Sequence, residues 1–210
     1  MKYVFTLFIM LLVATTANAA GSSVSYKVNG EPYEGYFISP SPDAALVLLV
    51  HDWDGLTDYE VKRANMLADM GYAVFAADLF GAGVRPTEVK DKRQHTGELY
   101  KDREKMRALL QGALKTAKSK GAKVHNAVAM GYCFGGAAVL EFARSGADLK
   151  GFVTFHGGLK TPAGQGYSKT KGKLLILLGT ADKNITMDQF AKLATELEEK
   201  GISHEMITYG

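Results

Sequence analysis

The stretch Gly131-Tyr132-Cys133-Phe134-Gly135-Gly136 follows directly on a largely apolar run at residues 126–130. An apolar strand that breaks into Gly-x-Cys-x-Gly-Gly, and then into the helix-forming residues 137–142, is typical of a tight strand-to-helix turn with one nucleophile at its apex. Glycines flank the cysteine because such a turn leaves no room for side chains. The thiol would begin the following helix, where unpaired N–H groups favour the thiolate. The pattern therefore predicts a reactive Cys133.

Composition limits what surrounds this turn. The chain has 210 residues, of which 47% are hydrophobic, so it can bury one sizeable core in a single domain. A formal charge of +3 is too close to neutral to indicate a nucleic acid or an anionic membrane as partner. Cys133 is the only cysteine, which excludes an internal disulfide. A lone cysteine can be a small buried hydrophobe, but a glycine-rich turn favours a chemical role.

The first residues have the pattern of a secretory signal peptide. A charged start is followed by an apolar segment at 3–14 and by Ala17-Asn18-Ala19, which predicts a leader at 1–19 that is cleaved after Ala19. The apolar segment is shorter than the roughly 20 residues that span a bilayer, which disfavours an uncleaved anchor. We therefore expect a periplasmic or secreted protein with one domain at 23–210.

Strands and helices alternate along most of the remaining chain. Two alternating segments around Asn29-Gly30 predict a hairpin. Capping boxes at Thr57 and Thr186, with Glu60 and Gln189 three residues on, predict two helix starts. A long polar helix with an apolar stripe is expected to cover Met106 to Ala117. Continuous apolar runs predict buried strands at 45–50, 72–77, 126–130, 151–155, 173–178 and 202–208.

This order predicts an α/β fold: a mainly parallel sheet with helices on both faces, joined by right-handed crossovers. The charged cluster 90–107 mixes both signs and is expected to be a solvated helix face. Residues 159–172, rich in Lys, Gly, Thr and Ser, are expected to be a surface loop without a core of their own.

In such sheets, ligands bind at the carboxyl ends of the strands. Several polar or reactive residues lie just past a predicted strand end and can therefore share one edge. They are His51, Asp52, Trp53, Asp78, Cys133, His156 and Asp182.

A thiol nucleophile needs a base, a carboxylate that orients the base, and N–H donors for the oxyanion. Cys133 and Asp182 occur in the order used on the hydrolase version of this sheet. The expected oxyanion donors are the backbone N–H groups of Phe134, next to the nucleophile, and of Trp53 in the loop after the first parallel strand.

The base should be a histidine after the final strand, and no histidine follows Thr208 in this sequence. His204 lies four residues earlier, roughly 13 Å back along a strand at ~3.3 Å per residue. His51 and His156 are on the predicted edge, but each follows a different strand. We favour a pocket-lining role for both over a role as base, because geometry comes before pKa in such assignments.

Three other interpretations use the same residues. A metal site of His51, Asp52, His156 and Asp182 lacks any HxxxH or CxxC spacing. Asp182 could be only a turn residue before the Thr186 cap. A redox-sensing thiol is disfavoured because no resolving cysteine is present. No metal, nucleotide or flavin is expected.

Several longer motifs occur together in this chain. They are Val50-His51-Asp52-Trp53-Asp54-Gly55-Leu56, Asp78-Leu79-Phe80-Gly81, the Cys133 turn, Phe155-His156-Gly157-Gly158-Leu159 and Gly179-Thr180-Ala181-Asp182, with Arg63-Ala64 and Gly71-Tyr72 between them. With these motifs, the chain from Tyr26 onward resembles the dienelactone hydrolase family of α/β-hydrolases, also called carboxymethylenebutenolidases.

The resemblance implies that Cys133 is the nucleophile and Asp182 the triad acid. The family commonly has an acid at the position of Asp52, usually Glu, which holds or receives the thiol proton. Its histidine would lie a few residues past Gly210, followed by a closing helix, so the given chain is expected to stop before both. For the arginines that bind a dienelactone carboxylate, this chain offers only Arg85 nearby, which does not support a dienelactone substrate.

The sequence therefore predicts a hydrolase that cleaves small esters or lactones through a cysteine thioester. The alternative is a catalytically inactive α/β-hydrolase-like protein that binds a small molecule in the same pocket. In either case the expected partner is a small molecule, with no nucleic acid and no stable membrane insertion, and the expected state is a monomer or small homo-oligomer.

Overall fold

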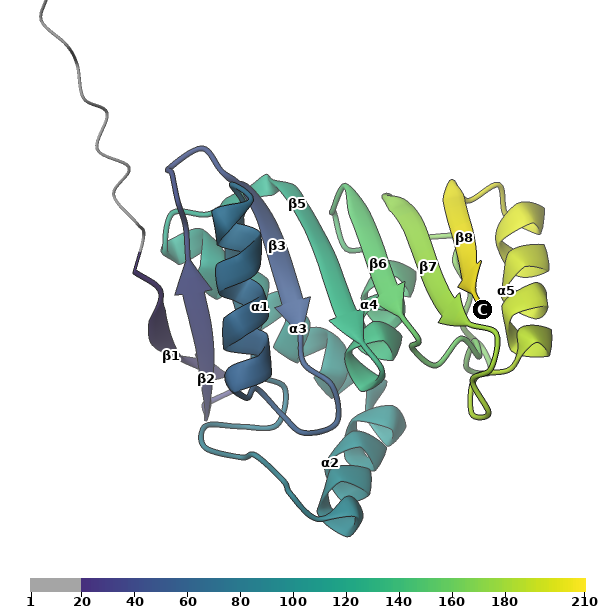
Figure 1. The fold of residues 1–210 in the computed structure, drawn as a ribbon, viewed down its shortest axis with the longest axis horizontal. Helices are drawn as coiled ribbons and strands as arrows, with labels where there is room; N and C mark the ends of the chain where they lie inside the picture. The colour runs from purple at the N-terminus through teal and green to yellow at the C-terminus, as the bar shows by residue number, and fades with distance from the viewer. Residues whose placement is uncertain (1–19) are drawn as a thin grey trace, which may run out of the picture.

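The computed structural model describes residues 20–210 (Figure 1). The predicted signal peptide at 1–19 lies outside the described residues. One eight-stranded sheet has the order β1-β2-β4-β3-β5-β6-β7-β8. The strands are β1 Ser22–Val28, β2 Glu31–Ile38, β3 Ala45–Val50, β4 Ala73–Ala77, β5 Lys123–Tyr132, β6 Gly151–Phe155, β7 Lys173–Gly179 and β8 His204–Tyr209. The helices are α1 Asp58–Asp69, α2 Val89–Lys101, α3 Arg103–Ser119, α4 Phe134–Arg144 and α5 Met187–Glu199.

The central strands are parallel, as the buried apolar runs predicted. From β4 through β8 every neighbouring pair is parallel, whereas β1, β2 and β4 pair antiparallel. Leu48 pairs with Phe75 on one side and with Ala129 on the other, and all three are fully buried. Strands buried on both faces need no polar alternation, which explains their continuous apolar sequences.

The predicted N-terminal hairpin is confirmed. Asn29 and Gly30 connect β1 to β2 with φ values of 52° and 89°. Two successive positive φ angles match the twist of the paired strands, and Asn-Gly adopts them at low cost.

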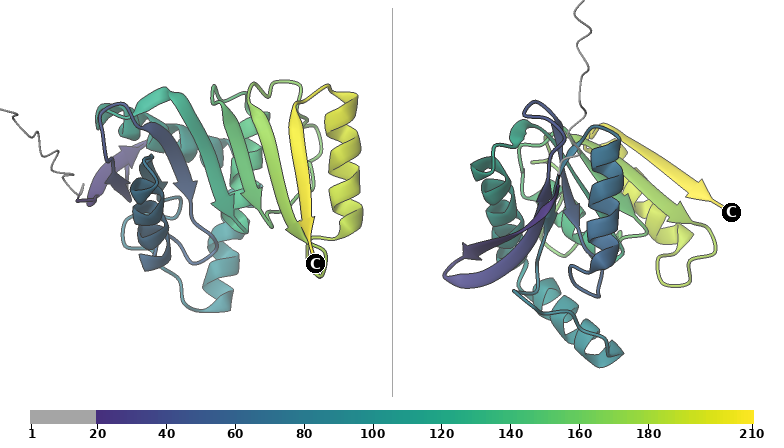
Figure 2. Two further views of the ribbon diagram at one scale, coloured as in Figure 1. Left: turned by 45° about the horizontal axis from the view of Figure 1, so that its top comes forward. Right: turned by 60° about the vertical axis from the view of Figure 1, so that its left-hand side comes forward.

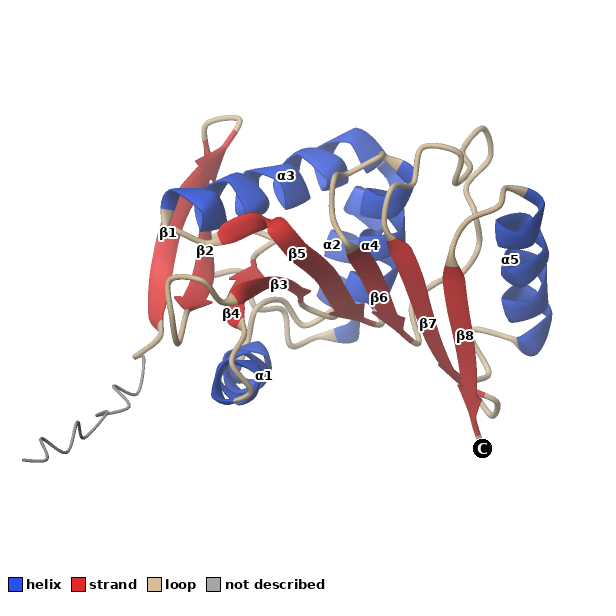
Figure 3. Ribbon diagram, turned by 90° about the horizontal axis from the view of Figure 1, so that it is seen from above, coloured by secondary structure: helices blue, strands red, loops and turns tan. Residues whose placement is uncertain are grey.

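Helices cover both faces of the sheet, as predicted. Figure 3 places α3, α4 and α5 on one side and α1 on the other. Within residues 20–210, no helix lies over β6, β7 and β8 on the α1 side. The side chains there are half-buried and apolar, as at Val153 and Leu175.

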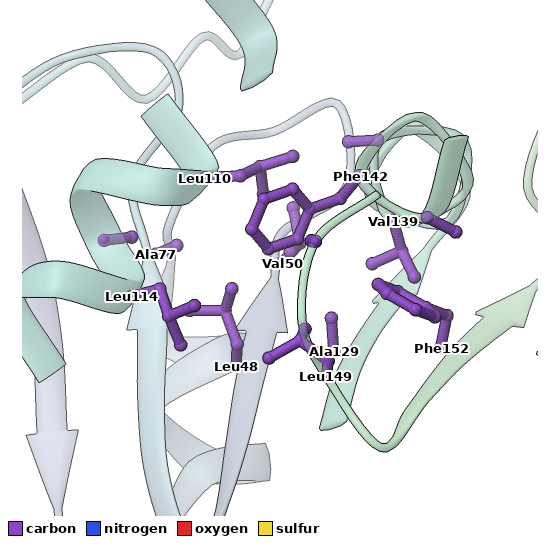
Figure 4. Packing of buried hydrophobic residues seen from close by; sticks show 14 of the residues in the cluster. Leu48, Val50, Ala77, Leu110, Leu114, Ala129, Val139, Phe142, Leu149 and Phe152 are labelled. Atoms are coloured by element: carbon purple, nitrogen blue, oxygen red, sulfur yellow. The ribbon is translucent and has the colours of Figure 1, made fainter. Parts of the chain in front are cut away.

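The larger core lies between the sheet and the α3–α4 layer (Figure 4). Leu110 and Leu114 of α3 meet Leu48 and Val50 of β3, and Phe142 of α4 packs edge-on against Phe152 of β6. Every predicted member of the α3 stripe is buried: Met106, Leu109, Leu110, Ala113, Leu114 and Ala117.

The predicted long polar helix is wrong in one respect, because it is two helices. The chain breaks at Asp102, where ψ is 81°, and the Asp102 carboxylate accepts a hydrogen bond from the Lys105 N–H to cap α3. Figure 2 shows that α2 consequently stands beyond the carboxyl ends of the central strands. The expectation of a solvated charged face at 90–107 is also wrong in part, because Arg103 and Arg107 pair with the buried Glu141.

Two smaller expectations also need correction. Thr57 and Glu60 form the predicted capping box, whereas at α5 only the Thr186 half forms, with its hydroxyl accepting from the Gln189 N–H. The loop at 159–172 does contribute to the core, because Leu159 and Tyr167 are buried. Within residues 20–210, no helix is both long enough and apolar enough to cross a membrane.

Candidate active site

The Gly131–Gly136 stretch forms a tight turn between β5 and α4, with Cys133 at its apex. Cys133 has φ 50° and ψ −112°, a conformation that side chains other than glycine rarely adopt. Its N–H donates to the Phe155 carbonyl of β6 at 3.0 Å. The thiol is therefore held in place by the neighbouring strand, and a backbone of this kind typically occurs at functional sites.

The glycines of the turn are required by close backbone approaches. A Cβ on Gly131 would lie 2.4 Å from the Gly135 carbonyl atoms, and one on Gly135 would lie 2.4 Å from the carbonyl oxygens of Val50 and His51. A Cβ on Gly136 would lie 2.3 Å from the hydroxyl of Thr154. Real Cβ atoms do not approach this closely, so α4 packs directly onto the ends of β3 and β5 only with glycine at these positions.

Burial and nearby carboxylates control the Cys133 thiol. Burial raises its pKa above the ordinary value, and the negative charges of Asp52, Asp182 and Asp54 raise it further. A hydrogen bond from the Phe134 N–H acts in the opposite direction but is outweighed. The prediction that the helix N-terminus alone would favour the thiolate is therefore wrong for this structure. A separate base must remove the proton.

Two of the three carboxylates have local roles in loops. The Asp182 carboxylate accepts from the N–H groups of Asn184 and Ile185 after β7, at 2.8 and 3.0 Å. The Asp52 carboxylate accepts from the Asp54 N–H at 2.9 Å. Both remain partly exposed, so each holds its turn and also keeps an oxygen available on the side of the thiol.

His51 is fully buried and both of its ring nitrogens are engaged. Nδ1 donates to the Asp52 carbonyl at 2.6 Å, and Nε2 accepts from the Leu79 N–H at 3.0 Å. Burial lowers the pKa of the ring, which keeps it neutral in this tautomer. His51 therefore joins the end of β3 to the loop after β4, and it has no face on an open pocket.

His156 lies differently. It follows β6, is exposed, and has a positive φ of 42°. Its N–H donates to the Leu177 carbonyl of β7 at 2.8 Å. Because the Cys133 N–H binds the preceding residue, Phe155, the ring of His156 belongs to the same edge as the thiol.

The expected oxyanion donors are on the same edge. Phe134 is the first residue of α4, and its N–H is directed at the Cys133 sulfur. Trp53 lies in the loop after β3, and the Lys92 ammonium sits 5.3 Å from its ring centroid. Lys92 also pairs with Asp54 at 2.5 Å, its only partner for that carboxylate oxygen within the described residues.

Arg85 points elsewhere. Its guanidinium donates to the Val84 carbonyl at 2.7 Å and lies 3.8 Å from the carboxylate of Asp78. Asp78 is itself buried and accepts from the N–H groups of Phe80 and Gly81. Both residues therefore stabilise the loop after β4. No cluster of three or more metal-ligating side chains occurs among residues 20–210.

Tyr100, at the end of α2, belongs to this site although the sequence did not indicate it. Its ring meets Phe134 edge-on at 5.5 Å, and the Arg103 guanidinium lies 4.8 Å from its centroid. Burial of the hydroxyl, then the Cys133 charge, raises the pKa of Tyr100 to about 12. The ring is 37% exposed, so water weakens this effect, but the direction leaves a neutral hydroxyl beside the thiol.

A cavity of about 270 Å³ lies next to the turn. Tyr100, Ala137 and Gly158 form the wall nearest the thiol, and Arg103, Lys160 and Asn184 contribute polar groups. Ala137 is one helical turn from the nucleophile, since its N–H donates to the Cys133 carbonyl at 3.2 Å. The arrangement offers space for a small organic molecule at the carboxyl edge of the sheet.

Comparison with known proteins agrees with this geometry. A "Putative carboxymethylenebutenolidase" of Aquifex aeolicus is 22% identical over 187 residues, which cover 87% of this chain and 80% of that protein. A solved structure named m3DLH superposes with a TM-score of 0.86 at 28% identity, covering 92% of this chain and 82% of its own. A dienelactone hydrolase-like promiscuous phosphotriesterase from metagenomic libraries superposes with a TM-score of 0.85 at 28% identity, covering 91% and 82%.

The family model described as the dienelactone hydrolase family matches residues 33–210, which is most of the chain and includes Cys133 and Asp182. The sheet order, the cysteine turn and this match agree with one another. The chain belongs to the dienelactone hydrolase family of α/β-hydrolases.

Proposed function

We propose that this chain hydrolyses small esters or lactones through a thioester on Cys133, with Asp182 orienting the general base. Family membership supports a hydrolase of such substrates. The observation that carries the cysteine mechanism is the strained turn, which holds the thiol at φ 50° with the Phe134 N–H directed at its sulfur.

In this mechanism the sulfur attacks the acyl carbon while the base takes the thiol proton. The carbonyl oxygen becomes an oxyanion that accepts from the N–H groups of Phe134 and Trp53. The carbon–oxygen bond then breaks, and the base returns the proton to the leaving alkoxide. Water next hydrolyses the thioester, which releases the acid and restores the thiol.

The raised pKa of Cys133 gives the base a necessary task. Burial and the carboxylates of Asp52, Asp54 and Asp182 keep the resting thiol protonated at neutral pH. A protonated thiol is a poor nucleophile and is also protected from oxidation. We propose that the base is a histidine located past Gly210, as the family resemblance implies, and that Asp182 orients it.

The test uses the full-length gene product and a p-nitrophenyl ester. Because Cys133 is the only cysteine, iodoacetamide modifies one site. The parent should release p-nitrophenolate, and both alkylation and Cys133→Ala should lower the rate by two or more orders of magnitude. An acid quench should trap an acyl group on Cys133, visible by mass spectrometry. An unchanged rate in Cys133→Ala would refute the role of the thiol.

Binding without turnover is the second candidate function. The observation in its favour is the pKa of Cys133, which is raised rather than lowered. In that case the parent would show no acyl adduct and no ester turnover, although a substrate analogue would still perturb the fluorescence of Trp53 beside the site.

We also propose that the chain is exported. The charged start and the apolar segment before Ala19 support cleavage there. N-terminal sequencing of the protein from the periplasm or medium should then begin at Ala20, and a cytoplasmic protein beginning at Met1 would contradict the proposal.

A further inference from the structure

A second cavity, of about 390 Å³, lies away from the thiol, between α3, the end of α4 and the loop at 159–172. Arg103, Arg107 and Arg144 line it, with Gln165 and the Lys169 side chain at the loop side. Cys133 is not among its lining residues. Figure 1 shows α3 and α4 running together behind the sheet, where this cavity opens.

The three arginines meet on one carboxylate. Glu141 of α4 is fully buried, and its oxygens lie 2.6 Å from Arg107, 2.9 Å from Arg144 and 3.6 Å from Arg103. Burial alone would raise the pKa of Glu141, but the arginines outweigh it and hold that pKa below the ordinary value. Glu141 is therefore ionised at neutral pH and supplies one negative charge.

One carboxylate neutralises only one of three guanidinium groups. Arginine stays protonated in proteins, so two positive charges have no counter-charge at this point. At the rim, Lys169 and Glu104 carry opposite charges and cancel. The mutual repulsion is visible at Arg103, whose pKa is lowered first by burial and then also by the charges of Arg144 and Arg107.

Donors remain available on two of these arginines. Arg107 uses Nε and Nη2 on Glu141, and Arg103 uses Nε on the Tyr100 carbonyl and Nη1 on Glu141. Nη1 of Arg107 and Nη2 of Arg103 donate to no protein oxygen among the described residues. The two side chains are 31% and 22% exposed, so a ligand can reach them from the cavity.

The floor of the cavity is rigid. Arg144 is 2% exposed, and its guanidinium donates to Gln165, to the Tyr167 hydroxyl and to Glu141 at 3.0, 2.7 and 2.9 Å. Tyr167 is itself fully buried. A guanidinium cluster that is already fixed loses little conformational entropy when an anion binds.

We propose that this cavity is a binding site for a divalent oxyanion, such as a phosphate group, held between Arg103 and Arg107. Guanidinium groups match the oxygen geometry of phosphate, and the ligand's two charges would balance the two surplus positive charges. The site is independent of ester hydrolysis, because it includes neither Cys133 nor Asp182.

The competing explanation is that the arginines only clamp α3, α4 and the loop onto Glu141. A clamp requires no ligand and predicts no selectivity among anions. Titration of the folded full-length protein with inorganic phosphate at about pH 8, followed by calorimetry at constant ionic strength, separates the two. We expect one site with a Kd of about 1 mM or tighter. Sulfate should compete, and acetate, with one charge, should bind at least fivefold more weakly.

Variants place the site. Arg107→Gln and Lys169→Gln should each raise the Kd for phosphate, by roughly fivefold or more for Arg107, since one contact between unit charges is lost at ~4 Å. Lys171→Gln is the matched control, because this cation of the same loop is 58% exposed and pairs only with exposed Asp148. Circular dichroism establishes that each variant is folded.

Absence of binding at ~10 mM phosphate would overturn the proposal. So would an affinity that Arg107→Gln and Lys169→Gln leave unchanged, or a preference for acetate. Ester hydrolysis is measured in parallel on the same variants, so failure of the anion site and failure of the proposed function appear in different assays.

Discussion

Replacing Cys133 by glycine is expected to stabilise the fold relative to replacing it by alanine, while both variants lose the thiol. A side chain at φ 50° and ψ −112° costs about 1–3 kcal/mol in backbone strain. Glycine removes that strain but gives up about 0.5–1 kcal/mol of backbone entropy. Loss of the half-buried Cβ costs a few tenths of a kcal/mol more, at ~0.8 kcal/mol per fully buried methylene.

The balance makes Cys133→Gly more stable than Cys133→Ala by about 1 kcal/mol. Urea unfolding of the two proteins measures this difference directly, because neither contains a thiol that could oxidise. A shift of about 2–4 °C in Tm should accompany it. Ala137→Gly, one turn along α4 in ordinary helical backbone, is the matched control and should instead destabilise by about 1 kcal/mol.

If Cys133→Gly proved no more stable than Cys133→Ala, the turn would not store strain, and its conformation would need another explanation. The comparison therefore tests whether the protein gives up stability to hold its nucleophile at the apex, as expected of a functional site.

Three further predictions follow from the same contacts. Gly135→Ala should lower the free energy of unfolding by roughly 1–3 kcal/mol in urea, since its Cβ would meet two carbonyl oxygens at 2.4 Å, whereas Gly97→Ala in α2, with open space around it, should raise it by up to about 1 kcal/mol. Glu141→Gln should cost about 3 kcal/mol at neutral pH; because the folded pKa of Glu141 lies below its ordinary 4.5, this stabilisation is present above pH 4.5 and is lost as the pH falls, so urea curves of the two proteins should converge in acid and would contradict us if they stayed parallel. Asp182→Asn should lower the pKa of Cys133 and speed its alkylation by iodoacetamide at neutral pH, and an unchanged rate-against-pH profile would show that this carboxylate does not act on the thiol.

Two positions show how the same residue type can differ in role. His51 and His156 both follow a strand at the carboxyl edge, and sequence placed them together. In the structure His51 is buried with both nitrogens bonded, while His156 is exposed near the thiol. Burial and hydrogen-bond partners depend on loops distant in sequence, so spacing alone could not separate the two.

The sequence by itself determined the order of strands and helices and the turn at Cys133. These features follow from short-range rules: runs of apolar residues, capping residues, and glycines where the backbone has positive φ or approaches another chain segment. The hairpin at Asn29-Gly30, the strand Ala45–Val50 and the cap at Thr57 are all in place because each rule acts over a few residues.

Only the tertiary structure decided the charge state of the thiol and the contacts of α2 and α3. The carboxylates that raise the pKa of Cys133 come from loops after β3 and β7, and Arg107 lies 34 residues from Glu141. Electrostatic energy depends on distance in space and on exclusion of water, and neither quantity is encoded in local spacing. For that reason, Tyr100 beside the nucleophile and the arginine-lined cavity became visible only in the folded chain.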